Sequence, residues 1–240
     1  MDAYIAQWIG TRAQQQDSCA VRHFPDGSLA VVCDGMGGHE DGAAASKLAA
    51  DTFVEVFADE AELPLTDRLH EALEAANTAV GEHFARTKGY GGTTLVAAFA
   101  SHGVLRWISV GDSGLYLLRG GRLLRLNADH SMRGLLREYT LPGGMTPKEI
   151  ARSGHCLRSA VTGGEMTLID APKMPYPLLR GDLILLASDG ADELLESPES
   201  VDRFDFFREG KSPAVAVVEY CHDLQQPHAD NVTVISMTVE

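Results

Sequence analysis

The chain has 240 residues, which suits one large domain or two small ones. Apolar residues make up 45% and charged residues 22%, and this composition excludes a disordered or low-complexity protein. A formal net charge of −14 argues against a basic face that binds nucleic acid or an acidic membrane surface. No run approaches about 18 consecutive apolar residues, and the N-terminus does not have the pattern of a signal peptide. A cytoplasmic protein without membrane spans is therefore expected.

Short apolar runs bounded by turn residues predict β-strands along most of the chain. Several runs are joined by glycine-containing turns of a few residues, and this spacing favours antiparallel hairpins over parallel βαβ units. The predicted strands cover, in chain order, residues 19–24, 28–33, 93–100, 104–110, 115–118, 122–126, 183–187 and 232–239.

Three segments carry apolar residues every three or four positions and predict helices with one buried face, at 45–56, 69–84 and 214–224. The third follows Ser212 and Pro213, an N-cap and a first-turn proline, and Ser197-Pro198 repeats this signal for a shorter helix. Because each long helix has a single apolar stripe, each should cover a sheet on one side. The pattern predicts an α+β fold with sheets inside and helices outside.

Two zones are predicted to be loops, at 59–65 and 139–164. The second is too long for an ordinary connection, which indicates a functional or mobile segment. Strong strand signals lie on both sides of it, and no Pro/Ser-rich linker interrupts the sequence. The chain is therefore treated as one domain over residues 1–240.

Aspartates recur where apolar strands end. The run 29–33 leads into Asp34-Gly35, and the run 183–188 leads into Asp189. A buried strand would fix the position of its carboxylate, and the following glycine lets the backbone turn. Asp-Gly alone is a common turn dipeptide, but further aspartates occupy comparable positions, namely Asp17, Asp112 and Asp230.

Carboxylates gathered at one end of a sheet repel one another unless cations lie among them. No His or Cys accompanies these aspartates, so the ligands would be hard oxygens, which favour Mg²⁺ or Mn²⁺ over Zn²⁺. Two such ions can activate a water molecule and hold a phosphoryl group. Arg12, which precedes Asp17 by five residues, is suited to grip phosphate oxygens, although by itself it equally fits a solvated surface arginine.

A series of short motifs then extends over the chain from about Gly10 to Ile235. In order they are R-A-Q-Q-Q-D, V-V-C-D-G-M-G-G-H, G-G-T-T-L-V, V-G-D-S-G, A-D-H-S, L-R-S-A-V-T-G-G, L-A-S-D-G-A-D-E-L and D-N-V-T-V. With these motifs the sequence resembles the metal-dependent serine/threonine protein phosphatases of type 2C, most of all their compact bacterial branch.

The resemblance implies a four-layer α-β-β-α sandwich with two central, mainly antiparallel sheets. It also implies a flap at about 132–157 beside the active site, and two Mn²⁺ or Mg²⁺ ions with a weaker third. By this resemblance Asp34 would bridge the two ions, Asp189 and Asp230 would complete one, and the Gly35 carbonyl would help hold the other. Asp112, together with Asp189, matches the third site.

The resemblance further implies direct attack of metal-activated water on the phosphorus, without a phosphoenzyme. Arg12 would hold the substrate phosphate and Asp17 would orient the metal-bound water. Three departures from the family pattern stand out: Gln15 where Asn is usual, Gly114 where many members have Arg, and Met36 where eukaryotic members often have a histidine proton donor. The general acid is therefore open, with His39, His130 and His155 as candidates, and each of these histidines equally suits a structural role.

The leading hypothesis is a phosphatase that removes phosphate from serine and threonine of proteins and opposes a bacterial Ser/Thr kinase, with a monomer as the expected state. Two alternatives stay open. One is a catalytically weak pseudophosphatase that binds phosphoproteins, and retention of the proposed metal aspartates and Arg12 argues against it. The other is a phosphoesterase for small molecules, which nothing in the sequence excludes.

Overall fold

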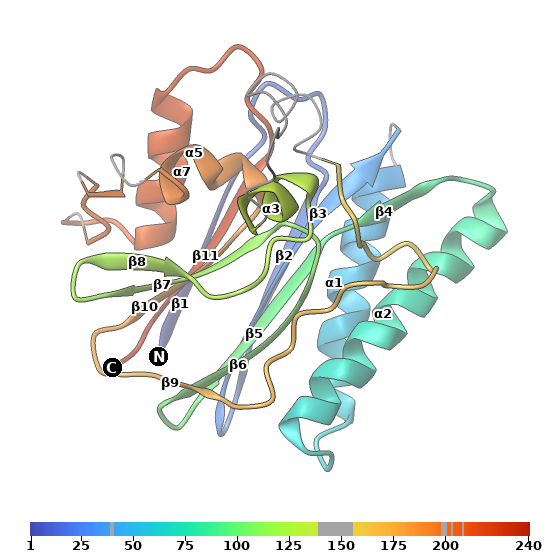
Figure 1. Ribbon diagram of the computed structural model, residues 1–240, viewed down its shortest axis with the longest axis horizontal. Coiled ribbons are helices and arrows are strands. Elements are labelled where there is room, and N and C mark those ends of the chain that lie inside the picture. The colour runs from blue at the N-terminus through green and yellow to red at the C-terminus, as the bar shows by residue number, and fades with distance from the viewer. Residues whose placement is uncertain (39–40, 139–155, 198–200, 203, 208) are drawn as a thin grey trace.

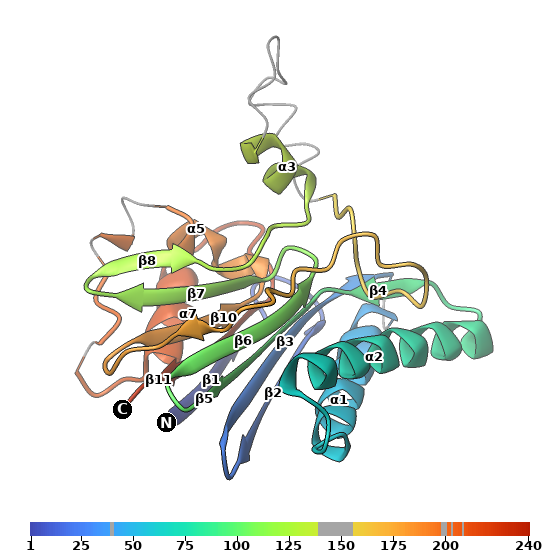
Figure 2. The same ribbon diagram turned by 60° about the horizontal axis from the view of Figure 1, so that its bottom comes forward.

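The computed structural model describes residues 1–38, 41–138, 156–197, 201, 202, 204–207 and 209–240. Within these residues, two sheets stack against each other and helices cover their outer sides (Figures 1 and 2). The predicted α+β sandwich of antiparallel sheets is confirmed. In the same part of the chain, none of the helices is long and apolar enough to cross a bilayer.

The first sheet joins the two ends of the chain. Its strands lie in the order β1, β11, β10, β7 and β8, and all neighbours are antiparallel. The bounds are Asp2–Trp8 for β1, Val232–Thr238 for β11, Leu183–Ala187 for β10, Gly114–Arg119 for β7 and Arg122–Arg125 for β8. The sheet thus brings the chain segments around residues 8, 188 and 231 together at one of its ends.

The second sheet is built mainly from the first half of the chain. Its strands lie in the order β2, β3, β5, β6 and β9, and β4 pairs with the end of β3. The bounds are Asp17–Phe24 for β2, Gly27–Gly37 for β3, Gly91–Thr93 for β4, Leu95–Ser101 for β5, Val104–Val110 for β6 and Tyr176–Pro177 for β9.

The three predicted long helices are confirmed. Two of them, α1 (Asp41–Asp59) and α2 (Leu65–Thr87), cover the second sheet, and α7 (Pro213–Asp223) covers the first (Figure 1). At the start of α7 the Ser212 hydroxyl accepts a hydrogen bond from the Val215 amide at 3.4 Å, as an N-cap should. Shorter elements are α3 (Met132–Glu138), the 3₁₀ turn η1 (Asp189–Ala191) and α5 (Asp192–Leu195).

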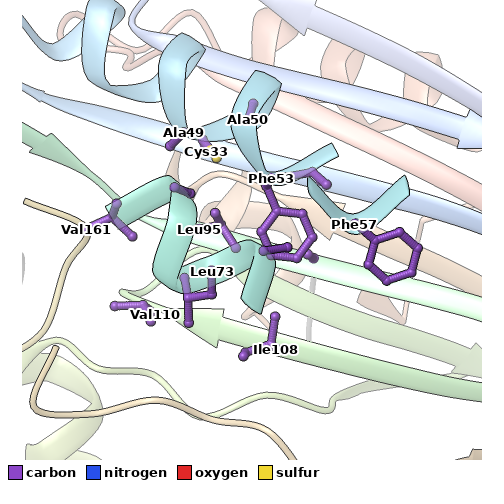
Figure 3. Close-up of a cluster of buried hydrophobic side chains, with 14 of the residues drawn as sticks. Cys33, Ala49, Ala50, Phe53, Phe57, Leu73, Leu95, Ile108, Val110 and Val161 are labelled. Carbon is purple, nitrogen blue, oxygen red and sulfur yellow. The ribbon is translucent and has the colours of Figure 1, made fainter. Parts of the chain in front are cut away.

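Apolar side chains fill all three interfaces between the layers. Phe53 and Phe57 of α1 belong to one buried cluster with Leu73 of α2 and Ile108 of β6, which Figure 3 shows. Between the two sheets, residues such as Ile184 pack without exposure to water. Burial of each such side chain contributes about 1.5–3 kcal/mol. The core thus holds the strand ends, where the polar residues lie, in fixed positions.

Several elements differ from the sequence prediction. The strand β1 was not predicted, because an edge strand with many half-exposed residues shows little alternation. The strand predicted at 93–100 is divided at Thr94 into β4 and β5. Ser197 is described, but Pro198, where the shorter helix was predicted to begin, and most of the loop at 139–164 lie outside the described residues. Of the predicted flap, the described parts are α3 and residues 156–157.

Candidate active site

The predicted aspartates meet at one end of the sandwich. Asp17 is the first residue of β2 and lies opposite Asp34 of β3 in the sheet register. Asp189 follows β10 and Asp230 precedes β11, its antiparallel neighbour, while Asp112 follows β6. A cavity of 310 Å³ is lined by four of them, namely Asp34, Asp112, Asp189 and Asp230. Sequence reasoning therefore selected residues that the fold brings together.

The strand that carries Asp34 corrects one expectation. Asp34 and Gly35 were expected to lie in a turn after the strand, but β3 continues to Gly37 and pairs there with β4. A Cβ atom at Gly35 would lie 2.2 Å from the Gly42 carbonyl oxygen and 2.4 Å from that of Gln16. Glycine is required here because the neighbouring backbones approach so closely, and not because the chain turns.

Burial and mutual repulsion disfavour negative charge in this cluster. Burial, followed by the charges of neighbouring aspartates, raises the pKa of Asp34 well above its ordinary value. Burial likewise raises the pKa of Asp17 to about 6, although hydrogen bonds from Thr233 and Ser188 oppose this rise. The pKa of Asp112 rises to about 7, again chiefly through burial. Divalent cations would offset this accumulation of buried carboxylates.

The residues of the cluster fit a hard cation in two further respects. Asp17 Oδ1 is buried and has no hydrogen-bond partner among the described residues, while Oδ2 accepts from the Ser188 hydroxyl at 2.8 Å. The donor atoms are carboxylate and carbonyl oxygens, which suit Mg²⁺ or Mn²⁺. In the described part of the chain, however, no three or more His, Cys, Asp or Glu side chains already converge on a single ion position. The carboxylates would therefore have to close around the ions.

Asn231 fixes the loop that carries Arg12. Its Nδ2 donates to the carbonyls of Ile9 at 2.8 Å and Gln14 at 3.1 Å, and its Oδ1 accepts from the Gln16 amide at 2.8 Å. Sequence reasoning missed this role, although Asn231 belongs to the quoted D-N-V-T-V motif. An asparagine beside a functional aspartate was the available signal, but its partners lie more than 200 positions away.

Arg12 itself reaches the cluster. Its Nη2 donates to Asp230 Oδ2 at 2.5 Å, and its side chain is 54% exposed. The guanidinium therefore lies at the mouth of the acidic cavity, which it also lines. The departure at Gln15 is accommodated locally, because its Oε1 accepts a hydrogen bond from the Asp17 amide at 3.2 Å.

Hydroxyl groups hold the backbone of Asp34, and sequence reasoning did not assign them. Thr94 Oγ1 accepts from the Asp34 amide at 2.9 Å and shares a hydrogen bond of 2.7 Å with Ser113 Oγ. Thr93 Oγ1 donates to the Asp34 carbonyl at 2.9 Å. These buried groups connect Asp34 with the residue after Asp112. The three hydroxyl residues belong to the G-G-T-T and G-D-S motifs, but the spacing of these motifs does not show which groups the hydroxyls bind.

The structure describes the other two departures from the family pattern, Gly114 and Met36, and one of the three candidate histidines. At Gly114, a Cβ atom would lie 2.2 Å from the Tyr116 ring, so this ring occupies the space of a side chain, while Met36 lines the acidic cavity. His130 is buried, and its Nδ1 accepts from the Gly111 amide at 3.2 Å, which gives it a structural role. His39 and His155 lie outside the described residues.

Comparisons with known proteins agree with this geometry. A family model described as Protein phosphatase 2C matches residues 7–215, and the chain belongs to this family. The serine/threonine protein phosphatase PstP of Mycobacterium tuberculosis is 31% identical over 232 residues, covering 93% of this chain and 42% of that protein. This chain thus spans less than half of that relative. The serine/threonine phosphatase stp of Listeria monocytogenes is 28% identical over 181 residues, covering 71% of this chain and 69% of its own length.

Solved structures share the fold over the whole chain. A crystal structure of the M. tuberculosis PstP phosphatase has a TM-score of 0.79 at 27% identity and covers 100% of this chain and 98% of that one. The PstP catalytic domain in complex with two manganese ions has a TM-score of 0.74 at 28% identity, with coverages of 100% and 98%. Stp1 from Staphylococcus aureus, at 24% identity, has a TM-score of 0.83 and supports the fold, with coverages of 100% and 95%.

Proposed function

We propose that residues 1–240 form a metal-dependent catalytic domain that hydrolyses phosphoserine and phosphothreonine in proteins. The observation that carries this proposal is the cavity in which Arg12 lies beside four aspartates. A site built only to bind phosphate has no use for so many carboxylates, because they repel the ligand. A site that gathers cations around a phosphoryl group requires them.

The proposed role of each ligand is the one that the resemblance to type 2C phosphatases implies. Asp34 would bridge two Mn²⁺ or Mg²⁺ ions, Asp189 and Asp230 would complete one of them, and the Gly35 carbonyl would help hold the other. Asp112 would join Asp189 at a weaker third ion. When bound, the cations supply charge neutralisation at the phosphoryl oxygens and lower the pKa of water.

Two further residues act on substrate and water. Asp17 Oδ1, buried and without a hydrogen-bond partner among the described residues, would accept a hydrogen bond from water in the site and so orient it. Arg12 would turn its guanidinium to the phosphate, which it can bind through two parallel N–H groups. His155 and His39 are proposed as alternative donors of the proton to the leaving serine or threonine oxygen.

The names of the relatives support protein substrates, since PstP and stp are called serine/threonine phosphatases. We infer that the substrate proteins are phosphorylated by a cognate Ser/Thr kinase and that the domain acts as a monomer. Retention of the four cavity aspartates speaks against a pseudophosphatase. A small-molecule phosphoesterase would instead prefer nucleotides or sugar phosphates over phosphopeptides, and a comparison of turnover on a nucleotide and on a phosphopeptide measures this preference.

The test is hydrolysis of a phosphothreonine peptide with Mn²⁺, with Mg²⁺ or with EDTA. Wild type is compared with Asp34→Ala and with Asp51→Ala, an exposed position on α1 that serves as control. Turnover should require a divalent metal, vanish in Asp34→Ala and persist in Asp51→Ala, while calorimetry should show weaker Mn²⁺ binding to Asp34→Ala alone. A folded wild type that binds phosphopeptide without turnover would instead indicate a pseudophosphatase.

A further inference from the structure

A second cavity opens directly beside the proposed phosphate site. It measures 540 Å³ and shares Arg12, Asp189 and Asp230 with the acidic cavity. Its walls come from the region of α5 on one side and from the end of α7 on the other, two helices that contact each other (Figure 1). A volume of this size lies within the range of cavities that bind ligands.

The cavity continues away from the phosphate site. A neighbouring cavity of 530 Å³ shares Asp192, Glu193 and Leu224 with it and extends to Glu196 and Tyr220. We call the two cavities together the flanking groove. Because the groove begins at the residues proposed to hold the phosphate, a chain segment attached to a bound phosphoresidue can extend along it.

The lining of the flanking groove is partly apolar and partly acidic. Trp8 and Leu224 provide apolar surface. Glu193 of α5 lines both cavities and is exposed. Its side chain has neither a hydrogen bond nor an ion pair within the described residues. An aromatic and aliphatic wall next to a free carboxylate suits the alkyl stem and the cationic head of arginine or lysine.

The two arginines of the groove are already engaged. Arg12 pairs with Asp230, and Arg133 pairs with Asp192 at 2.5 Å and lies 3.7 Å from Asp129. Neither therefore neutralises Glu193. Once cations occupy the site at Asp189 and Asp230, Glu193 is the groove's available acceptor for a basic side chain.

We propose that the flanking groove holds the part of the phosphoprotein substrate next to the phosphorylated residue, and that Glu193 selects an arginine or lysine there. This inference rests on the proposed phosphatase function and adds a substrate preference to it. Glu193 acts on specificity, since exposed charge pairs discriminate between partners more than they add affinity.

The test uses phosphothreonine peptides that differ at single positions on either side of the phosphothreonine, with arginine, alanine or glutamate there. Values of kcat/KM are compared for wild type, Glu193→Gln and Glu193→Lys. Glu71→Gln serves as control, because Glu71 is exposed on α2 and does not line the groove. Wild type should prefer arginine over alanine about two- to fivefold at one or more positions, as expected for an exposed ion pair.

Each variant should affect this preference for arginine differently. Glu193→Gln should abolish it, Glu193→Lys should reverse it toward glutamate, and Glu71→Gln should preserve it. The preference should also weaken with added salt. Equal kcat/KM for all peptides in wild type, or a preference that survives in both Glu193 variants, would overturn the role of Glu193.

The alanine peptide separates this proposal from the one it rests on. Its turnover with Mn²⁺ reports the phosphatase activity independently of any charge preference. If wild type hydrolyses no peptide, the proposed function fails. Fluorescence anisotropy of the same peptides, labelled with a fluorophore, then tests whether the groove prefers a basic side chain. Equal binding of the arginine and glutamate peptides would overturn the groove proposal as well.

Discussion

The two ends of strand β10 carry aspartates in opposite electrostatic situations. Asp182, just before the strand, is 2% exposed and receives two hydrogen bonds from Arg119, at 2.8 Å and 2.5 Å. These bonds hold its pKa below the ordinary value. At the other end, Asp17 and Asp112 are likewise almost unexposed but lie deeper in the protein, next to Asp189, and burial raises their pKa values to about 6 and about 7.

The difference separates a structural carboxylate from those proposed to act in the site. Asp182 is charge-compensated by the chain itself, since the Leu179 amide also donates to it at 2.7 Å. The aspartates at the far end chiefly face one another, and their arrangement becomes favourable when cations bind. Carboxylates of the same type and similar exposure are thus distinguished by their depth in the protein and by the charges that lie opposite them.

The largest expected effect comes from Asp189→Asn, at the catalytic end of β10. Metal-dependent turnover of a phosphothreonine peptide should fall about a thousandfold or more, since a catalytic metal contributes several kcal/mol to transition-state stabilisation. The melting temperature of the metal-free protein should stay equal or rise, because one of the mutually repelling charges is removed. Near-normal turnover would contradict the ligand role of Asp189.

The opposite end should respond in stability instead. Arg119→Met removes the cation that pairs with Asp182, and because Arg119 is partly exposed, water partly replaces it; the change should cost about 2 kcal/mol of the free energy of unfolding. The cost should appear in urea denaturation, while kcat of the metal-loaded protein remains unchanged. A stability loss below about 0.5 kcal/mol would mean that the pair behaves like a solvated surface ion pair.

A smaller effect is expected for Asp182→Asn, which retains one acceptor, and it should depend on pH. At pH 7 the change should cost about 1.5 kcal/mol, typical of hydrogen bonds to a charged group. Because folding lowers the pKa of Asp182, its contribution is complete above the ordinary pKa of about 4 and is lost as pH falls through the folded value. Unfolding curves of wild type and variant should therefore converge between about pH 5 and pH 2; a constant difference would argue against the pair.

The smallest effect concerns Arg12, which pairs with Asp230 and is proposed to hold the substrate phosphate. Arg12→Ala should raise KM for a phosphopeptide about tenfold, the equivalent of a charge-assisted hydrogen bond, and lower kcat less. Stability should change little, because the side chain is 54% exposed. Steady-state kinetics at saturating Mn²⁺ measure both constants, and an unchanged KM would remove Arg12 from phosphate binding.

Much of the fold was readable from local pattern. Apolar residues recur with the helical period in α1, α2 and α7, because each helix packs one face against a core. They form short runs in β3, β5, β6 and β10, because these strands pack one or both faces against a core. The strand β1 was not predicted, since it forms by pairing with β11 at the opposite end of the chain. Local periodicity reports burial, and an edge strand is buried too little to show it.

By itself, the sequence determined which residues could carry the chemistry. Aspartates after buried strands, an arginine nearby and the order of the motifs are properties of the chain, and they led to the family. Only the tertiary structure decided that Asp17 lies opposite Asp34, that Asn231 holds the Arg12 loop, and that Arg119 compensates Asp182 while Asp112 stays among carboxylates. The physical reason is that the charge state of a buried carboxylate depends on its neighbours in space, and strand register, not sequence distance, selects those neighbours.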